Sequence, residues 1–562
     1  AVMMRARSWG TAAAVILLAF VLAACGSLPT TGPVNAGQPI ADDDSNDNLV
    51  LIPDGPTKDA TPQQIVEGFI AAGSGPRDNW ATAKEFLAPD VAWNPRAGVT
   101  VYSAGQRELE EVAQDEFILV VTPAATVDAT GELSTSTETG EISLPFTLAQ
   151  QADGQWRITQ APDGIVLDRT TFGTVFDSYA LQFFDPSWTY LVPDDRWFPR
   201  TYARTSIAEA LVNGGPSPWL TGAVSTAFAD GARLATVAVP EQSGVAAVSL
   251  QEGARDLDQL VLDRMQTQLE ASLATAGVSE VDMLVDEQLL VADAVTVRRT
   301  TVDTRPLVLT DTAFGFLSGT SVEEITGLSA AILETTATDI EVGADRTTAA
   351  VRDANGEVLA VDSDGTNEVL DDRVGLIAPS IDPYGIVWSV PQSEPAGLQA
   401  LRADGVEVEL SDAWPGASEV LAQRVSRDGT RLAAVVRTGD EYALWVAAIQ
   451  RDREGVPTVL GVPKVLATLP GKTTALTWVD SATVAVVTED DGDLYLYTHQ
   501  IGGFGTLQRS PDEVTALAGG TQSGGVRVRD AAGELYGQRS SNNWQHLASG
   551  IRVLAIQQGS PR

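Results

Sequence analysis

The stretch Ile381-Asp382-Pro383-Tyr384-Gly385, followed by apolar residues to Val390, is one copy of a unit that decides the fold of the C-terminal half. The unit consists of a polar turn with Asp or Gly, an apolar strand, a second Gly turn and a second strand. Another clear copy begins at Val425-Ser426-Arg427-Asp428-Gly429 and runs to Val436. A third covers residues 344–361, and two looser copies cover 478–497 and 521–536.

The spacing of these copies is that of a β-propeller. A four-stranded propeller blade takes about 40–50 residues. Five blades are visible, and the segment 306–317 is the candidate start of a sixth, so we expect an all-β propeller of five or six blades over 296–562. The alternative is a single β-sandwich, but a repeat spread over about 250 residues is long for one. The copies are anchored 37, 46, 52 and 41 residues apart at Asp345, Asp382, Asp428, Asp480 and Thr521.

The segment 179–295 predicts a separate α/β module. A short helix over 207–211 is followed by Gly214-Gly215-Pro216, and strands are expected at 223–228, 234–239, 245–250 and 281–285. A long helix is expected over 254–275, closed by a glycine at 277. Its apolar residues keep a helical period of 3.6 residues, and they are Leu257, Leu260, Val261, Met265, Leu269 and Leu273.

The segment 59–178 predicts a small α+β domain. Thr61 is a suitable helix N-cap and Pro62 suits the first helical position. Strand patterns follow at 117–121, 140–148 and 156–158. Helices followed by an antiparallel sheet loosely resemble NTF2-like folds, which hold ligands in the concavity of the sheet. No His or paired-carboxylate pattern marks a catalytic version, so we expect a scaffold.

The N-terminus predicts export and lipid attachment. Arg5 and Arg7 precede an apolar run over 12–22, which has the length of a signal-peptide core. The run ends in Leu22-Ala23-Ala24-Cys25, and Cys25 is the single cysteine. This pattern resembles a bacterial lipobox, which implies cleavage between Ala24 and Cys25 and diacylation (palmitate) of the thiol. Residues 1–24 are then a signal peptide and 25–58 a lipidated polar linker; the alternative is an ordinary signal peptide or an uncleaved anchor.

The charge balance excludes one large class of partner. With 36 basic and 75 acidic residues, the formal net charge is −39. Nucleic-acid binding needs a basic face, so we expect no nucleic-acid partner. An anionic bilayer surface would repel this chain as well, which leaves the lipid on Cys25 as the expected membrane anchor.

No pattern in the sequence carries a catalytic, cofactor-binding or metal site. The only histidines, His499 and His546, have no partners for a triad or zinc site, and we expect both at the surface. Gly471-Lys472-Thr473 resembles the end of a phosphate-binding loop, but Leu466 stands where a glycine is required, so we expect a turn. The stretch 362–365 lacks the further ligands of a calcium loop and is expected to be a hairpin turn. We therefore expect a protein that is not an enzyme.

The middle module resembles a GerMN domain, which occurs in sporulation, germination and envelope proteins. The resemblance lies in Gly-Gly-Pro at 214–216, Ser-Thr-Ala-Phe-Ala-Asp-Gly at 225–231, Val-Ser-Leu at 248–250 and Val-Asp at 285–286. Ala229 and Glu287 depart from the usual proline and glycine, both at turn positions. Just before this region, Asp194-Asp195-Arg196-Trp197 is expected to be a packed domain junction.

The order of lipobox, polar stalk, α+β domain, GerMN-like module and propeller resembles the LpqB-type lipoproteins of actinobacteria. That resemblance implies a lipid-anchored protein on the extracytoplasmic face of the cell membrane. It also implies an accessory role in MtrA–MtrB two-component signalling, through contact with the extracytoplasmic domain of the sensor kinase MtrB. Two other readings are an envelope ligand-binding receptor that uses the propeller channel, and a hydrolase that uses unrecognised carboxylates.

Overall fold

The computed structural model describes residues 52–135, 140–228, 232–402, 407–410, 413–520, 525–540 and 542–561. The predicted lipidation residue Cys25 and the cleavage site between Ala24 and Cys25 lie outside these residues. Among the helices within these ranges, none combines the length and the apolar character needed to cross a bilayer.

The N-terminal domain begins with the helix α2 (Pro62–Ala72), as the sequence predicts. The side chain of Thr61 accepts a hydrogen bond from the Gln64 backbone, and the Gln64 side chain accepts one from the Thr61 backbone. This reciprocal pair satisfies two amides that the first helical turn leaves free. A second helical segment, α3 (Arg77–Lys84), is interrupted by a kink at residues 78–80, where Asp78, Asn79 and Trp80 have φ values of 50°, 56° and 58°.

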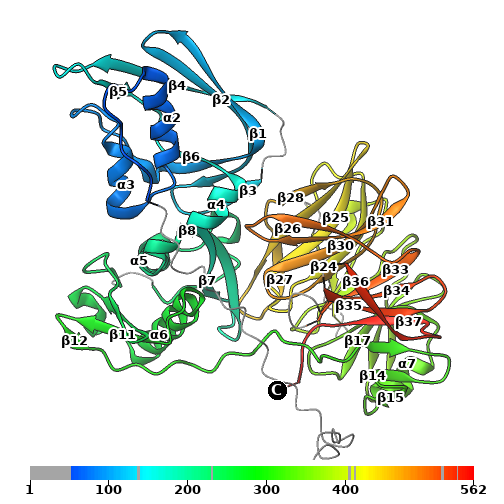
Figure 1. Ribbon diagram of the computed structural model, residues 1–562. Helices are drawn as coiled ribbons and strands as arrows, with labels where there is room; N and C mark the ends of the chain where they lie inside the picture. The colour runs from blue at the N-terminus through cyan, green and yellow to red at the C-terminus, as the bar shows by residue number, and fades with distance from the viewer. Residues whose placement is uncertain are drawn as a thin grey trace, which may run out of the picture. The chain divides into compact units, whose positions relative to one another are not determined.

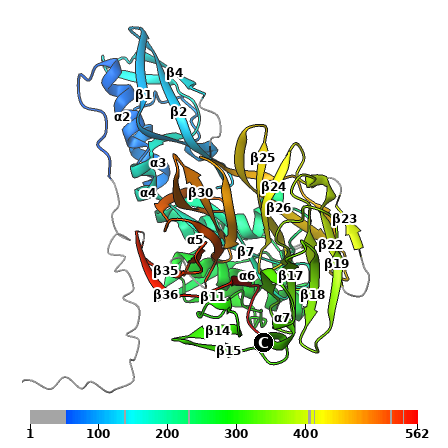
Figure 2. The same cartoon turned by 90° about the vertical axis from the view of Figure 1, so that its right-hand side faces the viewer.

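Helix α2 packs on a mainly antiparallel sheet with the strand order β5-β4-β2-β1-β6 (Figures 1 and 2). Only β1 and β6 run parallel. Helix α4 (Arg169–Val175) leads out of the domain. The α+β prediction is confirmed, whereas the comparison with NTF2-like folds stays a prediction. The strands are β1 (Gly98–Ala113), β2 (Glu116–Asp128), β3 (Leu133–Thr135), β4 (Ile142–Gln150), β5 (Trp156–Gln160) and β6 (Ile165–Asp168).

The middle module combines a two-stranded ribbon, two helices and a small sheet. The ribbon pairs β7 (Phe176–Phe184) with β8 (Leu191–Pro199). The helices are α5 (Ala203–Glu209) and α6 (Gln259–Leu273). The sheet has the order β12-β11-β10-β9, and its strands are β9 (Glu241–Gln242), β10 (Val245–Ser249), β11 (Glu280–Val285) and β12 (Gln288–Leu289).

Two details of the middle module differ from expectation. The segments 223–228 and 234–239 form only isolated bridges, to Phe184 and Leu250, so the strands predicted there are wrong. Helix α6 exposes 52 % of Leu260, while Leu262 is buried. The helix also buries polar residues, including Gln268, whose side chain accepts from the Ala227 backbone and donates to the backbone of Gln182. These hydrogen bonds fix the segment around residue 227, which therefore does not form a regular strand.

The C-terminal region is a propeller of six blades within the described residues, which confirms the propeller prediction (Figure 1). The sandwich alternative is wrong. Blade one contains β13 (Leu307–Leu309), β14 (Phe314–Ser318), β15 (Ser321–Glu324) and, as its innermost strand, β37 (Val553–Gln557). Blade two contains β16 (Ala337–Val342), β17 (Thr348–Asp353), β18 (Val358–Asp362) and β19 (Asn367–Asp371). Between blades one and two lies helix α7 (Leu328–Leu333).

The remaining blades follow in chain order. Blade three contains β20 (Ser380–Ile381), β21 (Val387–Ser389), β22 (Gln399–Leu401) and β23 (Glu407–Glu409). Blade four contains β24 (Glu419–Val425), β25 (Arg431–Thr438), β26 (Glu441–Arg451), β27 (Pro457–Leu460) and β28 (Lys464–Leu469). Blade five contains β29 (Thr473–Trp478), β30 (Thr483–Asp490), β31 (Asp493–Gln500) and β32 (Gly505–Arg509), and blade six contains β33 (Val514–Ala518), β34 (Arg527–Asp530), β35 (Leu535–Ser540) and β36 (Asn543–Ala548).

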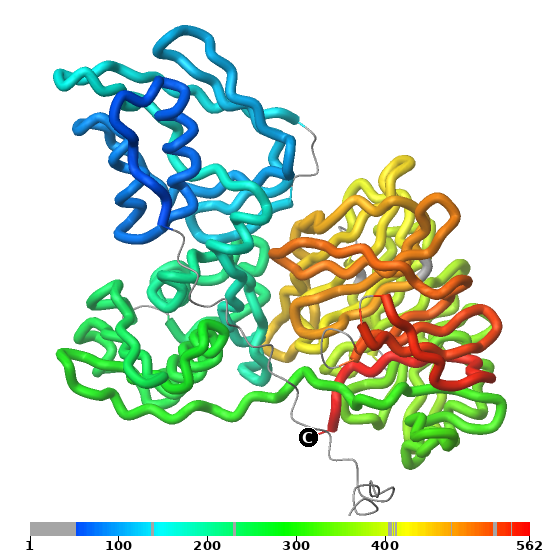
Figure 3. The backbone as a smooth tube through the Cα atoms, in the orientation of Figure 1, coloured from blue at the N-terminus to red at the C-terminus, as the bar shows by residue number. Residues whose placement is uncertain are grey.

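The last strand of the chain closes the propeller. Strand β37 pairs antiparallel with β13, with Ala555 opposite Leu307, and parallel with β16, with Ile556 opposite Glu341. The red end of the tube accordingly lies beside the green start of the propeller (Figure 3). Each repeat in the sequence marks the turn between the first and second strands of a blade. Blade one has no such turn, because its first two strands come from opposite ends of the region, and therefore only five copies are visible.

A buried charge in the closing strand tests this arrangement. Ala555 is 2 % exposed, and Ala555→Asp would bury an unpaired carboxylate between the first and last strands. We expect a loss of about 3 kcal/mol or more in the free energy of unfolding, measured by urea unfolding with tryptophan fluorescence. The matched control is Ala532→Asp in an exposed turn, which should leave the midpoint unchanged. Equal effects of the two substitutions would contradict closure by β37.

Candidate interaction site

The turn between β20 and β21 is built by one carboxylate. Asp382 Oδ1 accepts hydrogen bonds from the backbone N–H of Tyr384, at 2.9 Å, and of Ile386, at 3.0 Å. Gly385 supplies the positive φ of 78° that this turn requires. The sequence Asp-Pro-Tyr-Gly therefore forms a tight hairpin because the Asp side chain satisfies two amides that the turn leaves free.

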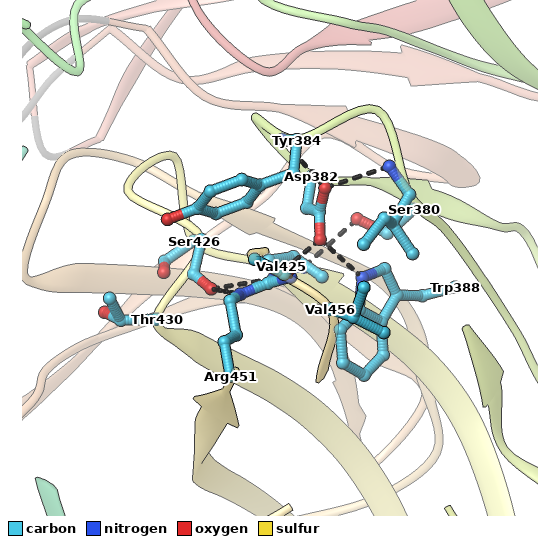
Figure 4. A network of polar contacts seen from close by, with 12 residues as sticks. Ser380, Asp382, Tyr384, Trp388, Val425, Ser426, Thr430, Arg451 and Val456 are labelled. Carbon is cyan, nitrogen blue, oxygen red and sulfur yellow. Dashed lines mark hydrogen bonds and ion pairs between the residues drawn. The ribbon is translucent and has the colours of Figure 1, made fainter. Parts of the chain in front are cut away.

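The second oxygen of the same carboxylate joins two blades (Figure 4). Asp382 Oδ2 accepts from Arg451 Nη2 at 2.6 Å and from Trp388 Nε1 at 3.1 Å. Both charged side chains are completely buried. Arg451 also donates to the carbonyl oxygens of Gly429 and Gly455, and its guanidinium lies 4.4 Å from the centre of the Tyr384 ring. The network is a buried, hydrogen-bonded ion pair between blades three and four, the kind that is costly to break.

Blade four has a similar buried carboxylate in the turn between its first two strands, β24 and β25. Asp428 accepts from Ser426 Oγ, from the Thr430 backbone and from Arg431, which also donates to the Ser481 carbonyl at 2.7 Å. Burial alone would raise the pKa of Asp428, but Arg431 and the hydrogen bonds outweigh it and hold that pKa below its usual range. Asp428 therefore stays ionised at the contact between blades four and five.

The same side of the propeller contacts the middle module. Tyr384 Oη donates to Asp185 Oδ2 at 2.8 Å. Asp185 is fully buried at the end of β7, and its other oxygen accepts from the backbones of Thr189, at 2.7 Å, and Tyr190, at 2.6 Å. Burial and the neighbouring Asp185 raise the pKa of Tyr384 well above its usual value, so the phenol keeps the proton that it donates. One carboxylate thus shapes the β7–β8 loop and binds it to the propeller.

The predicted junction at 194–197 is confirmed. Asp194 pairs with Arg196 at 2.9 Å and accepts from Ser217, all within the middle module. Asp195 accepts from Gln500 Nε2 at 2.7 Å, and Trp197 Nε1 donates to a backbone carbonyl in the β31–β32 turn at 2.8 Å. Burial raises the pKa of Asp195 to about 7. The motif is a packed contact between module and propeller.

Polar side chains join the innermost strands of neighbouring blades. Ser380 donates to Glu341 Oε1 at 3.0 Å, and Arg424 Nε lies 3.5 Å from Glu341 Oε2. Directly after β37, Gln558 donates to the carbonyl oxygen of Ser426 at 3.1 Å. These residues come from blades one to four, and Glu341 is 2 % exposed. Burial raises the pKa of Glu341 to about 7, against the opposing effect of Arg424.

The prediction that both histidines lie at the surface is confirmed for His546 and wrong for His499. His546 is exposed on β36, where its Nε2 lies 2.5 Å from Glu534. His499 is only 2 % exposed on β31, and burial lowers its pKa to about 4. Leu496 and His499, the two buried residues of β31, lie three positions apart and therefore on opposite faces of the strand. Because both faces of β31 are covered, alternation in the sequence did not reveal that His499 is buried.

The other sequence motifs are structural. The stretch 471–472 is a short turn that leads into strand β29 and not into a helix. Asp364 accepts from the Thr366 backbone in the hairpin turn between β18 and β19. Within the described ranges, no three His, Cys, Asp or Glu side chains are grouped so that they could hold a metal ion. The buried partner of Asp382 was not predicted, because Arg451 lies 69 residues away in the sequence.

Three family models match the chain in order along its length. The model described as "Lipoprotein LpqB, N-terminal domain" matches residues 55–173. The model described as "Sporulation and spore germination" matches 180–291, and "Lipoprotein LpqB beta-propeller domain" matches 316–553. The middle match supports the GerMN-like resemblance. The boundaries expected at 58/59, 178/179 and 295/296 stay predictions.

Several proteins named "Lipoprotein LpqB" are similar to this chain. The protein of Bifidobacterium longum is 26 % identical over 483 residues, which cover 82 % of this chain and 81 % of the relative. That of Streptomyces avermitilis is 23 % identical over 554 residues, which cover 89 % of both chains. That of Thermobifida fusca is 30 % identical over 267 residues, which cover 45 % of this chain and 42 % of the relative.

Solved structures give weaker likenesses. A nidogen/laminin complex aligns with a TM-score of 0.33 and 11 % identity over 44 % of this chain and 96 % of that one. TolB of Acinetobacter baumannii aligns with a TM-score of 0.26 and 12 % identity over 72 % of this chain and 79 % of that one. At TM-scores this low, neither likeness carries an argument.

Removal of the shared carboxylate tests the network around Asp382. Asp382→Ala leaves Arg451 buried without its counter-charge, so we expect a loss of about 3–5 kcal/mol in the free energy of unfolding. Asp382→Asn keeps an oxygen for the turn amides and should lose less. The control is Asp440→Ala, which removes a fully exposed partner of Arg437 and should leave urea unfolding unchanged. A loss from Asp382→Ala no greater than that from Asp440→Ala would show that the pair does not join the blades.

The buried histidine predicts a pH dependence of stability. The unfolded chain binds a proton at His499 below about pH 6.5, whereas the folded chain binds it only below about pH 4. The free energy of unfolding therefore decreases as the pH is lowered, by about 2 kcal/mol from pH 7 to pH 4.5. Asp195 and Glu341 act in the opposite direction, since burial raises their pKa values. The comparison of the chain with its His499→Phe variant at both pH values isolates the histidine, and an identical pH response of the two proteins would refute its role.

Proposed function

Because this chain belongs to the LpqB lipoprotein family, we propose that it is a membrane-anchored, non-enzymatic accessory protein of a two-component sensor kinase of the MtrA–MtrB type. In this proposal it modulates signalling linked to envelope and division control. Family membership makes it a membrane-associated protein of the cell envelope. The sensor kinase as partner rests on the family resemblance, and the way of binding rests on the propeller.

The proposed anchor is the N-terminal cysteine. After cleavage between Ala24 and Cys25, acylation of the thiol and of the new terminus would place two or more acyl chains in the bilayer. A single chain gives only marginal membrane binding, whereas two hold a protein stably. The polar linker would then carry the described part of the chain on the extracytoplasmic face. The motivation is the lipobox in the sequence.

The observation that carries the proposal is that the two ends of the propeller differ in what they contact. In a four-stranded antiparallel blade, the turns 1–2 and 3–4 lie at one end and the connections 2–3 and 4–1 at the other. The contacts described above between the middle module and the propeller use the first end, through Tyr384 in a 1–2 turn and Gln500 beside a 3–4 turn. The opposite end carries Val374, which is 95 % exposed in a 4–1 connection. We assign this end to the partner, because propellers commonly present a face as a binding scaffold.

The contacts between the innermost strands bear on the alternative of a ligand receptor. Glu341 of blade two binds Ser380 of blade three and lies against Arg424 of blade four. A ligand that entered between these strands would separate Glu341 from Arg424 and leave a buried charge without its partner, which is costly. We therefore favour recognition by a surface of the propeller over capture between its innermost strands.

Titration against the sensor kinase tests the proposal. The chain from residue 26 onward is titrated with the extracytoplasmic domain of the kinase by calorimetry, and then with both proteins tethered to one vesicle. We expect saturable binding, stronger by about 10²-fold on the shared membrane because tethering raises the local concentration. Absence of binding in both settings would contradict the accessory role.

Matched substitutions locate the binding face. Val374→Asp at the opposite end should weaken binding about tenfold or more, since a charge in a packed interface is costly. Val291→Asp changes a valine that is 75 % exposed in the middle module and should have no effect. If only Val291→Asp weakens binding, the partner contacts the middle module and not the propeller face.

A further inference from the structure

The N-terminal domain contains a cavity of about 170 Å³. It lies under the C-terminal half of α2 and crosses four neighbouring strands, β4, β2, β1 and β6. Phe69 covers it from the helix, Leu144 and Phe146 line it from β4, and Ile165 lines it from β6. The cavity therefore lies between α2 and the sheet, and none of its lining residues belongs to the junction at 194–197 or to the propeller.

Aromatic rings hold the cavity open. The ring of Phe69 lies edge-on to Trp93, with centroids 4.9 Å apart, and edge-on to Phe146, with centroids 6.0 Å apart. Trp93 is fixed in turn, because its Nε1 donates to the carbonyl oxygens of Pro162, at 3.1 Å, and Gly164, at 3.2 Å. These contacts prevent the large side chains from collapsing into the empty space.

The cavity opens towards a short loop. Asp163 is exposed, and its carboxylate accepts from the Asn94 backbone at 2.8 Å, whereas Trp93 and Phe146 are buried. The charged group thus lies at the entrance. The lining is mainly aromatic and aliphatic, and it also includes Thr100 and Thr126. Such a lining disfavours a charged ligand, because it holds no buried charge that would compensate for desolvation.

We propose that this cavity binds small molecules through one uncharged aromatic ring. Apolar cavities of about 150 Å³ lined by aliphatic and aromatic side chains stay dry and accept benzene. The edges and faces of Phe69, Trp93 and Phe146 surround a ring in the edge-to-face geometry that aromatic groups prefer. This inference is independent of the proposed partner on the propeller.

Fluorine NMR with fluorobenzene tests the cavity in the chain from residue 26 onward. No residue of the cavity lining falls within the removed segment 1–25. We expect the fluorobenzene resonance to broaden on addition of the chain, and Leu144→Phe to abolish the broadening by filling the cavity. The matched control is Leu109→Phe on β1 of the same sheet, outside the cavity lining, which should leave the broadening unchanged.

A reciprocal variant keeps the test decisive if Leu144→Phe does not fold. Leu144→Ala enlarges the cavity and should shift the preference from fluorobenzene towards 1-fluoronaphthalene, read out by competition on the same resonances. Broadening that persists in folded Leu144→Phe, or a preference that Leu144→Ala does not change, would overturn the assignment. Absence of broadening with the unmodified chain would overturn it as well.

Discussion

The buried ion pair between Asp382 and Arg451 is the interaction on which much of the described structure depends. Asp382 shapes its own hairpin with one oxygen and holds Arg451 with the other. Arg451 in turn lies against the ring of Tyr384, and Tyr384 binds Asp185 of the middle module. One carboxylate therefore connects a local turn, the contact between two blades and the contact between two modules. Its desolvation is tolerable because both oxygens of Asp382 accept hydrogen bonds and the guanidinium of Arg451 also donates to backbone carbonyls.

The sequence predicted those features that are encoded locally. The repeated polar turns predicted five blades, because a turn between adjacent strands is encoded by four or five consecutive residues. The longest strand of the N-terminal domain, β1, was missed because its outer half is exposed and rich in Glu, without apolar alternation. The strand expected at 223–228 failed because the side chain of Gln268, some forty residues away, takes its backbone bonds. Blade one, the sixth blade of the prediction, was visible only at its start, because its innermost strand β37 lies at the other end of the propeller region.

The candidate sites likewise divide into those encoded by consecutive residues and those formed only in the folded domain. The junction at 194–197 was predictable, since consecutive charges beside a tryptophan in an apolar stretch indicate a packed contact. The buried His499, the buried Glu341 and the cavity under α2 were not predictable, because each is defined by several strands that meet only in the folded domain. The cavity in particular is lined from α2 and four strands, and no single stretch carries its pattern.

The position of the closing strand has a consequence for the order of folding. Strand β37 pairs with β13 and β16, and Ala555 lies opposite Leu307, far away in the sequence. The ring therefore closes through a contact of high sequence separation, and such contacts form slowly because a long loop must be closed first. Until β37 has paired, β13 and β16 each present a free edge, and unpaired strand edges are templates for aggregation. Closure of the ring thus removes two aggregation-prone edges in a single step.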